Sequence, residues 1–293
     1  LDTIVSSEGV SGVHHGNKNG FLTASTSIKD ILNNKSINTV AIVTRHNDHA
    51  EQVVESLNAG KHVFVEKPLA LTLDEINKID EAYQENKKSK NLKLMVGFNR
   101  RFAPHIVKMK KLLESHHSPK SILMTINAGA IPDESWVQDV LIGGGRIVGE
   151  GCHFIDLMRY LIGHSISDFT ATMMGSVPGI KTREDKASIT LSFADGSFGT
   201  ILYLSNGGST FPKERVEVFC DNAVLQMDNY RTLIGYNWPG FKKMKLFKQN
   251  KGQKACVQAF TNSIIHAKDT PIPYEETIES SRVSIEIANL LRN

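Results

Sequence analysis

The stretch TVAIVTRHNDHAEQVVESLNAGKHVFVEKPLALT, residues 39–72, decides the fold class of this chain. Residues 39–44 are almost continuously apolar, which is typical of a strand covered on both faces. Residues 48–58 then repeat apolar side chains at helical spacing, and Gly60 follows where a helix end favours a left-handed residue. Residues 61–67 form a second strand-like run. Strand, helix and strand in this order indicate a parallel sheet with a crossover helix.

The same alternation continues on both sides of this stretch. Residues 2–6 read as a short strand and residues 27–34 as a short helix. Downstream, Thr72 and Glu75 have the spacing of a capping box that opens another helix. Residues 93–98 form a further apolar run, so the first part of the chain is predicted to be α/β.

Two segments of this first part are expected to lack regular structure. Residues 9–16 contain three glycines whose spacing is not GxGxxG, and they are interpreted as a loop. The lysine-rich, low-complexity residues 85–90 are expected to end the helix that begins at Thr72. Both interpretations rest on local composition.

The pattern changes near residue 120, where β-rich runs follow one another with turn signals and few helices. A helix-like segment at 146–161 and two amphipathic segments at 253–267 and 276–291 complete this part. We therefore expect α/β followed by α+β: an incomplete Rossmann-like parallel sheet in residues 1–120, then an open, mostly antiparallel sheet in residues 121–293. Helices should cover one face of that sheet, with the terminal helices packing back. The predicted strands are residues 121–128, 169–174, 187–193, 198–205, 215–220 and 223–228.

Composition narrows the class of function. The chain has 293 residues, 40% hydrophobic and 22% charged, with a formal charge of +3. That charge is too weak to indicate a nucleic-acid partner, and no apolar run approaches the ~20 residues that span a bilayer. The three cysteines are widely separated and form no CxxC, which argues against a disulfide framework and favours the cytoplasm.

Three predicted strands end in polar clusters at residues 45–49, 66–68 and 99–101. The carboxyl ends of parallel strands meet at one edge of a sheet, and ligands bind in the crevice beyond that edge. A single cluster is explained by the ordinary polarity of strand ends. Three on one edge point to a ligand site.

Lys67 is the most informative residue of these clusters. Because a residue before proline is held extended, its side chain should project from a stiff backbone at the lip of the crevice. A lysine fixed beside a ligand can act as an acid, a base or a hydrogen-bond donor. The alternative is a solvated lysine at the end of a strand.

The glycine-rich segment 143–156 is the second candidate region. Its glycines permit a tight turn or a close backbone approach before a helix begins. His153 with Asp156 or Glu150 could form an oriented acid–base pair, and Arg146 and Asp156 are predicted to contact the substrate. The alternative is that His153 is a hydrogen-bonded core residue.

His46 and His49 have HxxH spacing, so a metal-dependent hydrolase that also uses His153 is a competing interpretation. No further ligand is evident from the sequence. A turn at the end of a strand explains the pair more simply, and no metal is predicted.

Residues 39–72, LMVGFNRRF (residues 94–102) and GGGRIVGEGCHFIDLMRYLIG (residues 143–163) together resemble the Gfo/Idh/MocA oxidoreductases, the glucose–fructose oxidoreductase and inositol dehydrogenase family. The EKP tripeptide at 66–68 is the most specific part of this resemblance. The amino-acid sequence of these segments is also similar to the carboxy-terminal half of larger bacterial bi-domain oxidoreductases. Those proteins join such a unit to a zinc-type alcohol dehydrogenase-like region.

The resemblance implies a dehydrogenase that binds NAD or NADP and acts on a ring hydroxyl or ketone of a sugar, sugar nucleotide or cyclitol. Lys67 would contact the substrate hydroxyl and the nicotinamide ribose, and His153 would polarise or deprotonate the reacting hydroxyl. Asn99 and Arg100 would line the edge between nicotinamide and substrate. The implied cofactor-binding residues are Ser6, Ser7, Thr44, His46, Asn47, His49, Glu66 and Lys67.

Two departures from the family pattern matter. Many members carry an aspartate four residues before the histidine, where this chain has Gly149; Glu150 lies about 100° further around a helix. The expected first strand and glycine-rich turn of a dinucleotide fold also do not precede residues 2–6, so the chain is expected to be a fragment. These departures keep a rival hypothesis open: a catalytically silent sugar- or nucleotide-binding module.

Two further expectations complete the sequence-based prediction. The end of the second strand of a dinucleotide fold, which residues 2–6 resemble, normally holds an acidic residue when NAD is preferred. Ser6, Ser7 and Glu8 at this point leave the choice between NAD and NADP open. Apolar alternation in residues 187–203 is assigned to a homodimer or homotetramer interface. The alternative is that helices of the same chain cover it.

Overall fold

The N-terminal part of the chain contains five short parallel strands. The computed structural model describes residues 1–176, 178–179 and 182–293. The single parallel sheet that was expected is divided into two, since β1 pairs with β2 and β3, β4 and β5 pair in that order. Each strand has only three or four residues and so offers few backbone hydrogen bonds. The strands are β1 (Thr3–Val5), β2 (Thr23–Ser25), β3 (Thr39–Ile42), β4 (His62–Val65) and β5 (Leu94–Val96).

Helices connect these strands, as the sequence predicts. The capping box of Thr72 and Glu75 is present at the start of α4, and Gly60 has a φ of 74° beyond α3. Helix α4 includes the lysine-rich residues 85–90 and ends at Lys90, before an αL cap at Asn91, so the run was expected to end the helix but instead forms its last turns. The helices are α1 (Gly9–Asn19), α2 (Lys29–Leu32), α3 (His49–Asn58) and α4 (Leu73–Lys90).

The predicted loop at residues 9–16 is also wrong, because this segment lies within α1. A Cβ atom on Gly12 would lie 3.3 Å from the Cβ of Ser6, and one on Gly16 would lie 3.0 Å from Cγ2 of Ile4. The glycines that lower helix propensity are therefore those that let α1 pack closely on β1.

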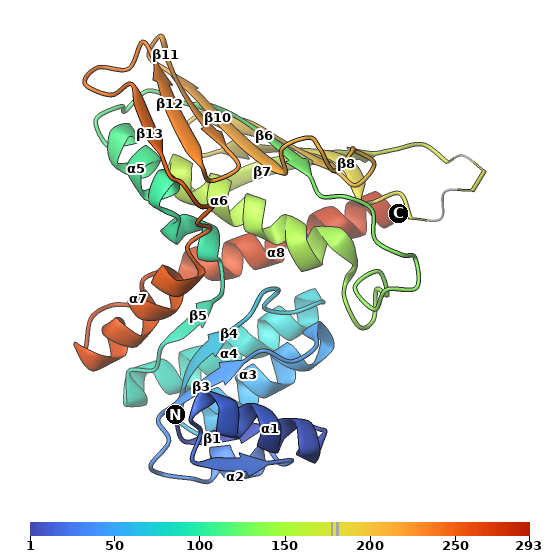
Figure 1. Ribbon diagram of the computed structural model, residues 1–293, viewed down its shortest axis with the longest axis vertical. Helices are drawn as coiled ribbons and strands as arrows, with labels where there is room; N and C mark the ends of the chain where they lie inside the picture. The colour runs from blue at the N-terminus through green and yellow to red at the C-terminus, as the bar shows by residue number, and fades with distance from the viewer. Residues whose placement is uncertain (177, 180–181) are drawn as a thin grey trace.

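Eight strands form one large sheet in the second part of the chain (Figure 1). Their order is β13-β12-β11-β10-β6-β9-β8-β7, and every pair is antiparallel except β6 with β9. Six strands match predicted runs, whereas β12 and β13 are additional. The strands are β6 (Ser121–Asn127), β7 (Ile166–Met173), β8 (Lys186–Phe193), β9 (Phe198–Leu204), β10 (Glu214–Cys220), β11 (Ala223–Asp228), β12 (Thr232–Tyr236) and β13 (Lys243–Lys245).

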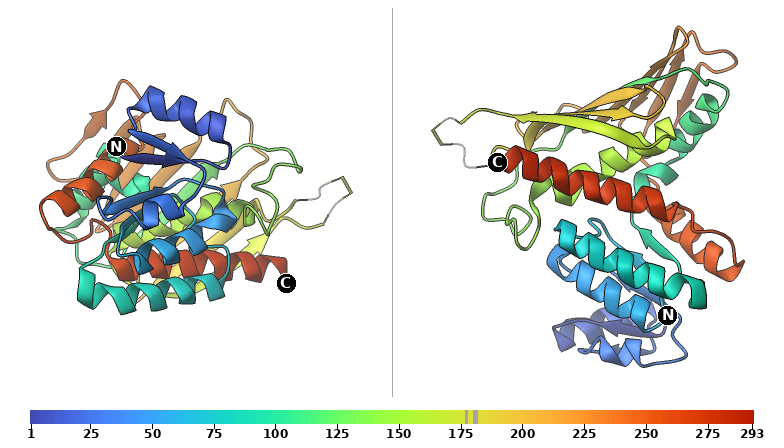
Figure 2. Two further views of the ribbon diagram at one scale, coloured as in Figure 1. Left: turned by 90° about the horizontal axis from the view of Figure 1, so that it is seen from below. Right: turned by 180° about the vertical axis from the view of Figure 1, so that it is seen from behind.

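Helices cover one face of this sheet (Figure 1). Helix α8 packs on α6 and β7 and also contacts α4 and β5, so it joins the two parts of the chain. Figure 2 shows α8 running between the large sheet and the N-terminal helices. Besides the N-terminal set, the helices are α5 (Pro104–Leu113), α6 (Cys152–Ile162), α7 (Gln253–Ile265) and α8 (Tyr274–Arg292).

The apolar alternation assigned to an oligomer interface faces these helices instead. Ile189, Leu191 and Ile201 are fully buried, and the ring of Tyr203 lies 6.4 Å from that of Phe154 on α6. On the opposite face, β8 presents polar side chains, whereas β9 presents the exposed Phe198 and the half-buried Leu202 and Leu204. Helix burial therefore explains the alternation, which was the alternative interpretation.

No helix among the described residues combines the length and the hydropathy that a bilayer crossing requires.

Candidate active site

Lys67 follows β4 and reaches across to the second part of the chain. Its Nζ donates a 2.5 Å hydrogen bond to the carbonyl oxygen of Gly149. Gly149 lies in a π-helical turn, η3 (Ile147–Gly151), that leads directly into α6. The half-buried lysine thus joins the carboxyl edge of the parallel sheet to the helix that carries His153.

His153 is buried in the first turn of α6, and its Nδ1 atom has no hydrogen-bond partner among the described residues. Burial, together with the positive charges of Arg100 and Lys67, holds the pKa of this imidazole well below its usual range. The ring is therefore neutral near pH 7, so it can accept a proton from a group placed beside it.

Glu150 does not orient His153. Its carboxylate accepts hydrogen bonds from Arg146 Nη2 at 2.7 Å and the Tyr203 hydroxyl at 2.6 Å, and it pairs with Lys213 Nζ at 3.2 Å. Burial alone would raise its pKa, but the Tyr203 bond and the charges of Lys213 and Arg146 lower it to about 2. Glu150 is thus a fixed anion near pH 7, and the expected pairing with His153 is not formed.

Asp156 does not orient His153 either. Its two oxygens accept 2.8 and 2.6 Å hydrogen bonds from Arg101, which also pairs with Glu276 of α8. The carboxylate is completely buried. Its hydrogen-bonding capacity is used within the protein, which argues against the predicted substrate contact.

The two arginines predicted near the substrate are engaged in a similar way. Arg100 forms a bidentate pair with Glu214, at 2.9 and 3.0 Å. Arg146 donates to the Tyr203 hydroxyl at 2.9 Å and to the Gly129 carbonyl at 3.2 Å, besides its bond to Glu150. The charge of Arg100 acts on the His153 imidazole, and Arg146 fixes Glu150 and Tyr203 by hydrogen bonds.

Asn99 remains at the edge of the site, half-buried, and donates through Nδ2 to the carbonyl of Lys251 at 2.7 Å. Lys251, Lys213 and Tyr203 belong to this region but were not expected from the sequence. Tyr203 lies in β9, Lys213 immediately before β10 and Lys251 shortly before α7. No local spacing relates them to His153, so only the fold reveals them.

The predicted HxxH pair turns inward. His46 Nδ1 hydrogen-bonds the Gly143 carbonyl at 2.8 Å, and burial lowers the pKa of this imidazole to about 4. His49 places Nδ1 2.7 Å from the Pro68 carbonyl and Nε2 3.2 Å from the Thr44 carbonyl. Carbonyl oxygens therefore engage three of the four ring nitrogens that a metal site on this pair could use.

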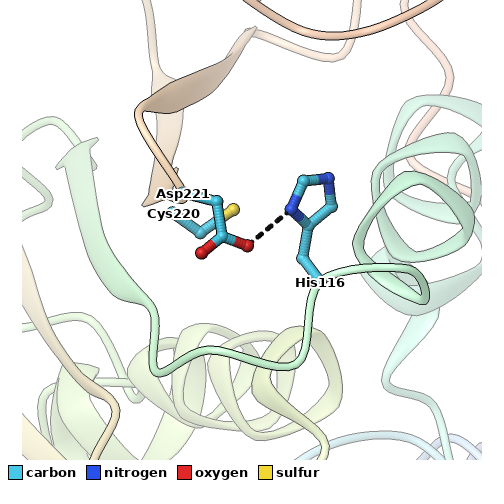
Figure 3. A group of neighbouring side chains, drawn as sticks. All are labelled: His116, Cys220 and Asp221. Atoms are coloured by element: carbon cyan, nitrogen blue, oxygen red, sulfur yellow. Dashed lines mark hydrogen bonds and ion pairs between the residues drawn. The ribbon is translucent and has the colours of Figure 1, made fainter.

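One group with metal-ligand chemistry is found among residues 1–176, 178–179 and 182–293, and it lies elsewhere: His116, Cys220 and Asp221. Figure 3 shows His116 directed at Asp221, with Nδ1 2.7 Å from Oδ2. His116 lies on the loop before β6, Cys220 ends β10, and Asp221 begins the turn to β11. The hydrolase interpretation based on His46, His49 and His153 is therefore not supported.

Close packing explains why residue 149 is a glycine. A Cβ atom there would lie 3.3 Å from both the Gly143 carbonyl oxygen and Cε1 of His46. An aspartate at this position would press on the buried His46. The glycine, unlike the aspartate of the resembled family, allows this close approach.

The remaining predicted cofactor residues lie at strand ends. Ser7, Thr44 and Asn47 are exposed after β1 and β3, and half-buried Ser6 accepts a 3.4 Å bond from the amide of Glu8. Their hydroxyl and amide groups are the donors and acceptors that a dinucleotide's riboses require. A Cβ on Gly97 would lie 3.0 Å from Oε2 of Glu66, so the glycine makes room for that carboxylate. This donor set fits NAD.

Comparison with known proteins gives the class. Residues 9–98 match an oxidoreductase family model with an NAD-binding Rossmann fold, and residues 107–226 match the GFO/IDH/MocA C-terminal domain. The two models belong together and cover most of the chain. The chain is a member of the Gfo/Idh/MocA oxidoreductase family, which confirms the resemblance and the expected fold class.

Two curated relatives illustrate the family. An uncharacterized oxidoreductase, YrbE, of Bacillus subtilis is 26% identical over 87% of this chain and 76% of its own length. A myo-inositol 2-dehydrogenase of Thermotoga maritima is 28% identical over 69% of this chain. The match spans only 60% of the Thermotoga enzyme's own length.

Solved structures share the fold. An oxidoreductase domain protein from Kribbella flavida has a TM-score of 0.85 at 20% identity, covering all of this chain and 89% of that one. A levoglucosan dehydrogenase in complex with NADH and levoglucosan has a TM-score of 0.83 at 20% identity, covering 99% of this chain and 88% of that one.

Proposed function

We propose that this protein is an NAD-dependent dehydrogenase acting on a ring hydroxyl, or the corresponding ketone, of a sugar, sugar nucleotide or cyclitol. The family membership and the names of the relatives, myo-inositol 2-dehydrogenase and levoglucosan dehydrogenase, support this class of substrate. The observation that carries the proposal is the meeting of Lys67 with the segment before His153. Lys67 comes from the other part of the chain and bonds the turn that precedes His153, and its charge acts on that imidazole.

In this proposal, His153 accepts the proton of the reacting hydroxyl during oxidation and returns it during reduction. Lys67 fixes the oxygen by hydrogen bonding, and its positive charge favours the developing alkoxide. The bound nicotinamide supplies the hydride acceptor or donor. Glu150 holds Arg146 and Lys213 in place, while Ser6, Ser7, Thr44, Asn47 and Glu66 line the nucleotide side.

The test is hydride transfer by the full chain, followed as NADH absorbance with neutral substrates, myo-inositol and levoglucosan, and with anionic ones, D-glucuronate and D-glucose 6-phosphate. Turnover that Lys67→Ala and His153→Asn abolish, with NADH binding retained in both variants, supports the proposal. Binding of NADH and sugar without turnover in the unmodified chain would favour the silent-module hypothesis instead.

Three finer assignments accompany this proposal. We place the domain boundary at residue 120, between α5 and β6, and the cytoplasm as the location, supported by three free, buried cysteines. We also propose a homodimer or homotetramer through the helix-free face of the large sheet, to be tested by light scattering of the full chain.

A further inference from the structure

The surroundings of His153 carry an excess of positive charge. Lys67, Arg100, Lys251 and Lys213 all lie close enough for their charges to act on the imidazole. They come from the end of β4, from the turn after β5, and from segments flanking α7 and β10. Arg146, in the turn before α6, is a fifth cation in the same cluster.

Among the described residues, two carboxylates pair with members of this group of five cations. Glu214 is shared by Arg100 and Lys251, with Lys251 Nζ 2.5 Å from Oε1. Glu150 is shared in the same way by Arg146 and Lys213. Lys67 has a neutral partner, the carbonyl of Gly149. Five positive charges against two negative charges leave an excess of three.

Neighbouring acidic groups do not remove this excess. Asp156 is already paired with Arg101, outside the cluster. Glu66 directs its carboxylate over Gly97 and towards Cys256 on α7, whose thiol it influences. Counting Glu66 against Lys67 would still leave two uncompensated cations.

Uncompensated charge in a partly buried site is unfavourable and is relieved by a bound counter-ion. The oxidised nicotinamide ring is itself positive, and the negative charges of the dinucleotide lie on its diphosphate, remote from the ring that exchanges hydride beside His153. The substrate is therefore the group best suited to place a negative charge against this cluster. Lys213 is the accessible member of the cluster, since 42% of its side chain is exposed.

We propose that the substrate is an anionic sugar derivative, whose carboxylate or phosphate group lies against Lys213. This inference rests on the proposed function and narrows its substrate class. Anions would bind beside His153 with the excess of positive charge as their main source of selectivity.

The test compares matched ligands that differ in charge. D-glucose, D-glucuronate and D-glucose 6-phosphate are titrated calorimetrically into the full chain saturated with NADH, at low and at high salt. At least one anion should bind 10-fold or more tightly than glucose, and the preference should shrink as salt screens the site. The two anions distinguish a carboxylate from a phosphate.

Lys213→Gln should reduce the anion preference at least five-fold, whereas Lys213→Arg should retain it. Lys78→Gln, which removes an exposed lysine of α4, is the matched control and should change nothing. Glucose binding as tightly as both anions, or a preference that survives Lys213→Gln in a folded variant, would overturn the inference. Failure of NADH to bind would instead count against the proposed dehydrogenase and is measured separately by nucleotide fluorescence.

Discussion

His153 and Asp156 lie three residues apart on α6, both buried, yet their surroundings are opposite. His153 has an unpartnered nitrogen and faces a group of cations. Asp156 is saturated by a bidentate arginine that also reaches α8. A buried polar group whose bonds are complete stabilises the fold, and one left incomplete is available to a ligand. The completeness of the hydrogen bonds, more than residue type or spacing, separates the proposed catalytic region around Lys67 and His153 from the structural region around Asp156 and Arg101.

The largest expected effect falls on the catalytic region. Lys67→Ala and His153→Asn should each lower kcat/KM by about 10³-fold, in the range expected for a lost general acid–base group. Lys67→Ala should fold, because the half-buried lysine makes one side-chain hydrogen bond within the described part of the chain. Steady-state kinetics with a urea titration of each variant checks this. If the loss of kcat/KM in these variants were matched by a loss of folded protein, the prediction that the two regions have different roles would be wrong.

The structural region should respond in the opposite way. Asp156→Asn leaves Arg101 buried without its main partner, so the free energy of unfolding should fall by about 3 kcal/mol, with kcat per folded molecule retained. Urea denaturation measures the change, and Asp269→Asn, at an exposed carboxylate, is the control. If Asp156→Asn lost turnover while its free energy of unfolding stayed unchanged, Asp156 would have a role in catalysis and not in stability.

His46 lies between the two regions and links stability to pH. Burial lowers its folded pKa to about 4, against 6.5 when unfolded, so the unfolded chain binds the proton more readily. The stabilisation is complete above pH 6.5 and is lost progressively as pH falls towards 4, by up to about 3 kcal/mol. His46→Gln should flatten this part of the stability profile, while His266→Gln should not. Parallel profiles for all three proteins would contradict the assignment.

The smallest effect concerns the shape of the rate profile. The pKa of His153 lies well below its ordinary value, so kcat/KM should show no limb near pH 6.5. Glu150→Gln should lower kcat/KM by about 10-fold through loosened Arg146 and Lys213, without changing that shape, because the pKa of Glu150 is about 2. A limb between pH 5.5 and 8 that is present in only one of the two proteins, the unmodified chain or Glu150→Gln, would show that Glu150 transfers a proton.

Several features were predictable from the sequence because they depend on local chemistry. The capping box at Thr72, the alternation of the large sheet and the strand ends bearing Lys67 follow from periodicity and neighbouring residues. Helix α1 was missed for the same reason, since glycine's low helix propensity hides its value for packing against Ile4 and Ser6.

The partners of the polar groups were not predictable. Glu150 and Asp156 have the spacing to reach His153, but neither does. Glu150 pairs with Arg146 of its own segment and with Lys213, and Asp156 pairs with Arg101. Which neighbour a carboxylate takes depends on distances between elements remote in sequence. Spacing along a helix gives the candidates and does not choose among them.

By itself, the sequence determined the order of most strands and helices, the position of the EKP segment at the end of a strand, and the family. Each of these depends on patterns formed by residues close together in the sequence. Only the tertiary structure decided that Lys67 meets the turn before His153, that Lys213 and Lys251 surround the same imidazole, and that Asp156 belongs to the core. Charges act through space, and chain folding brings together groups that no local pattern connects.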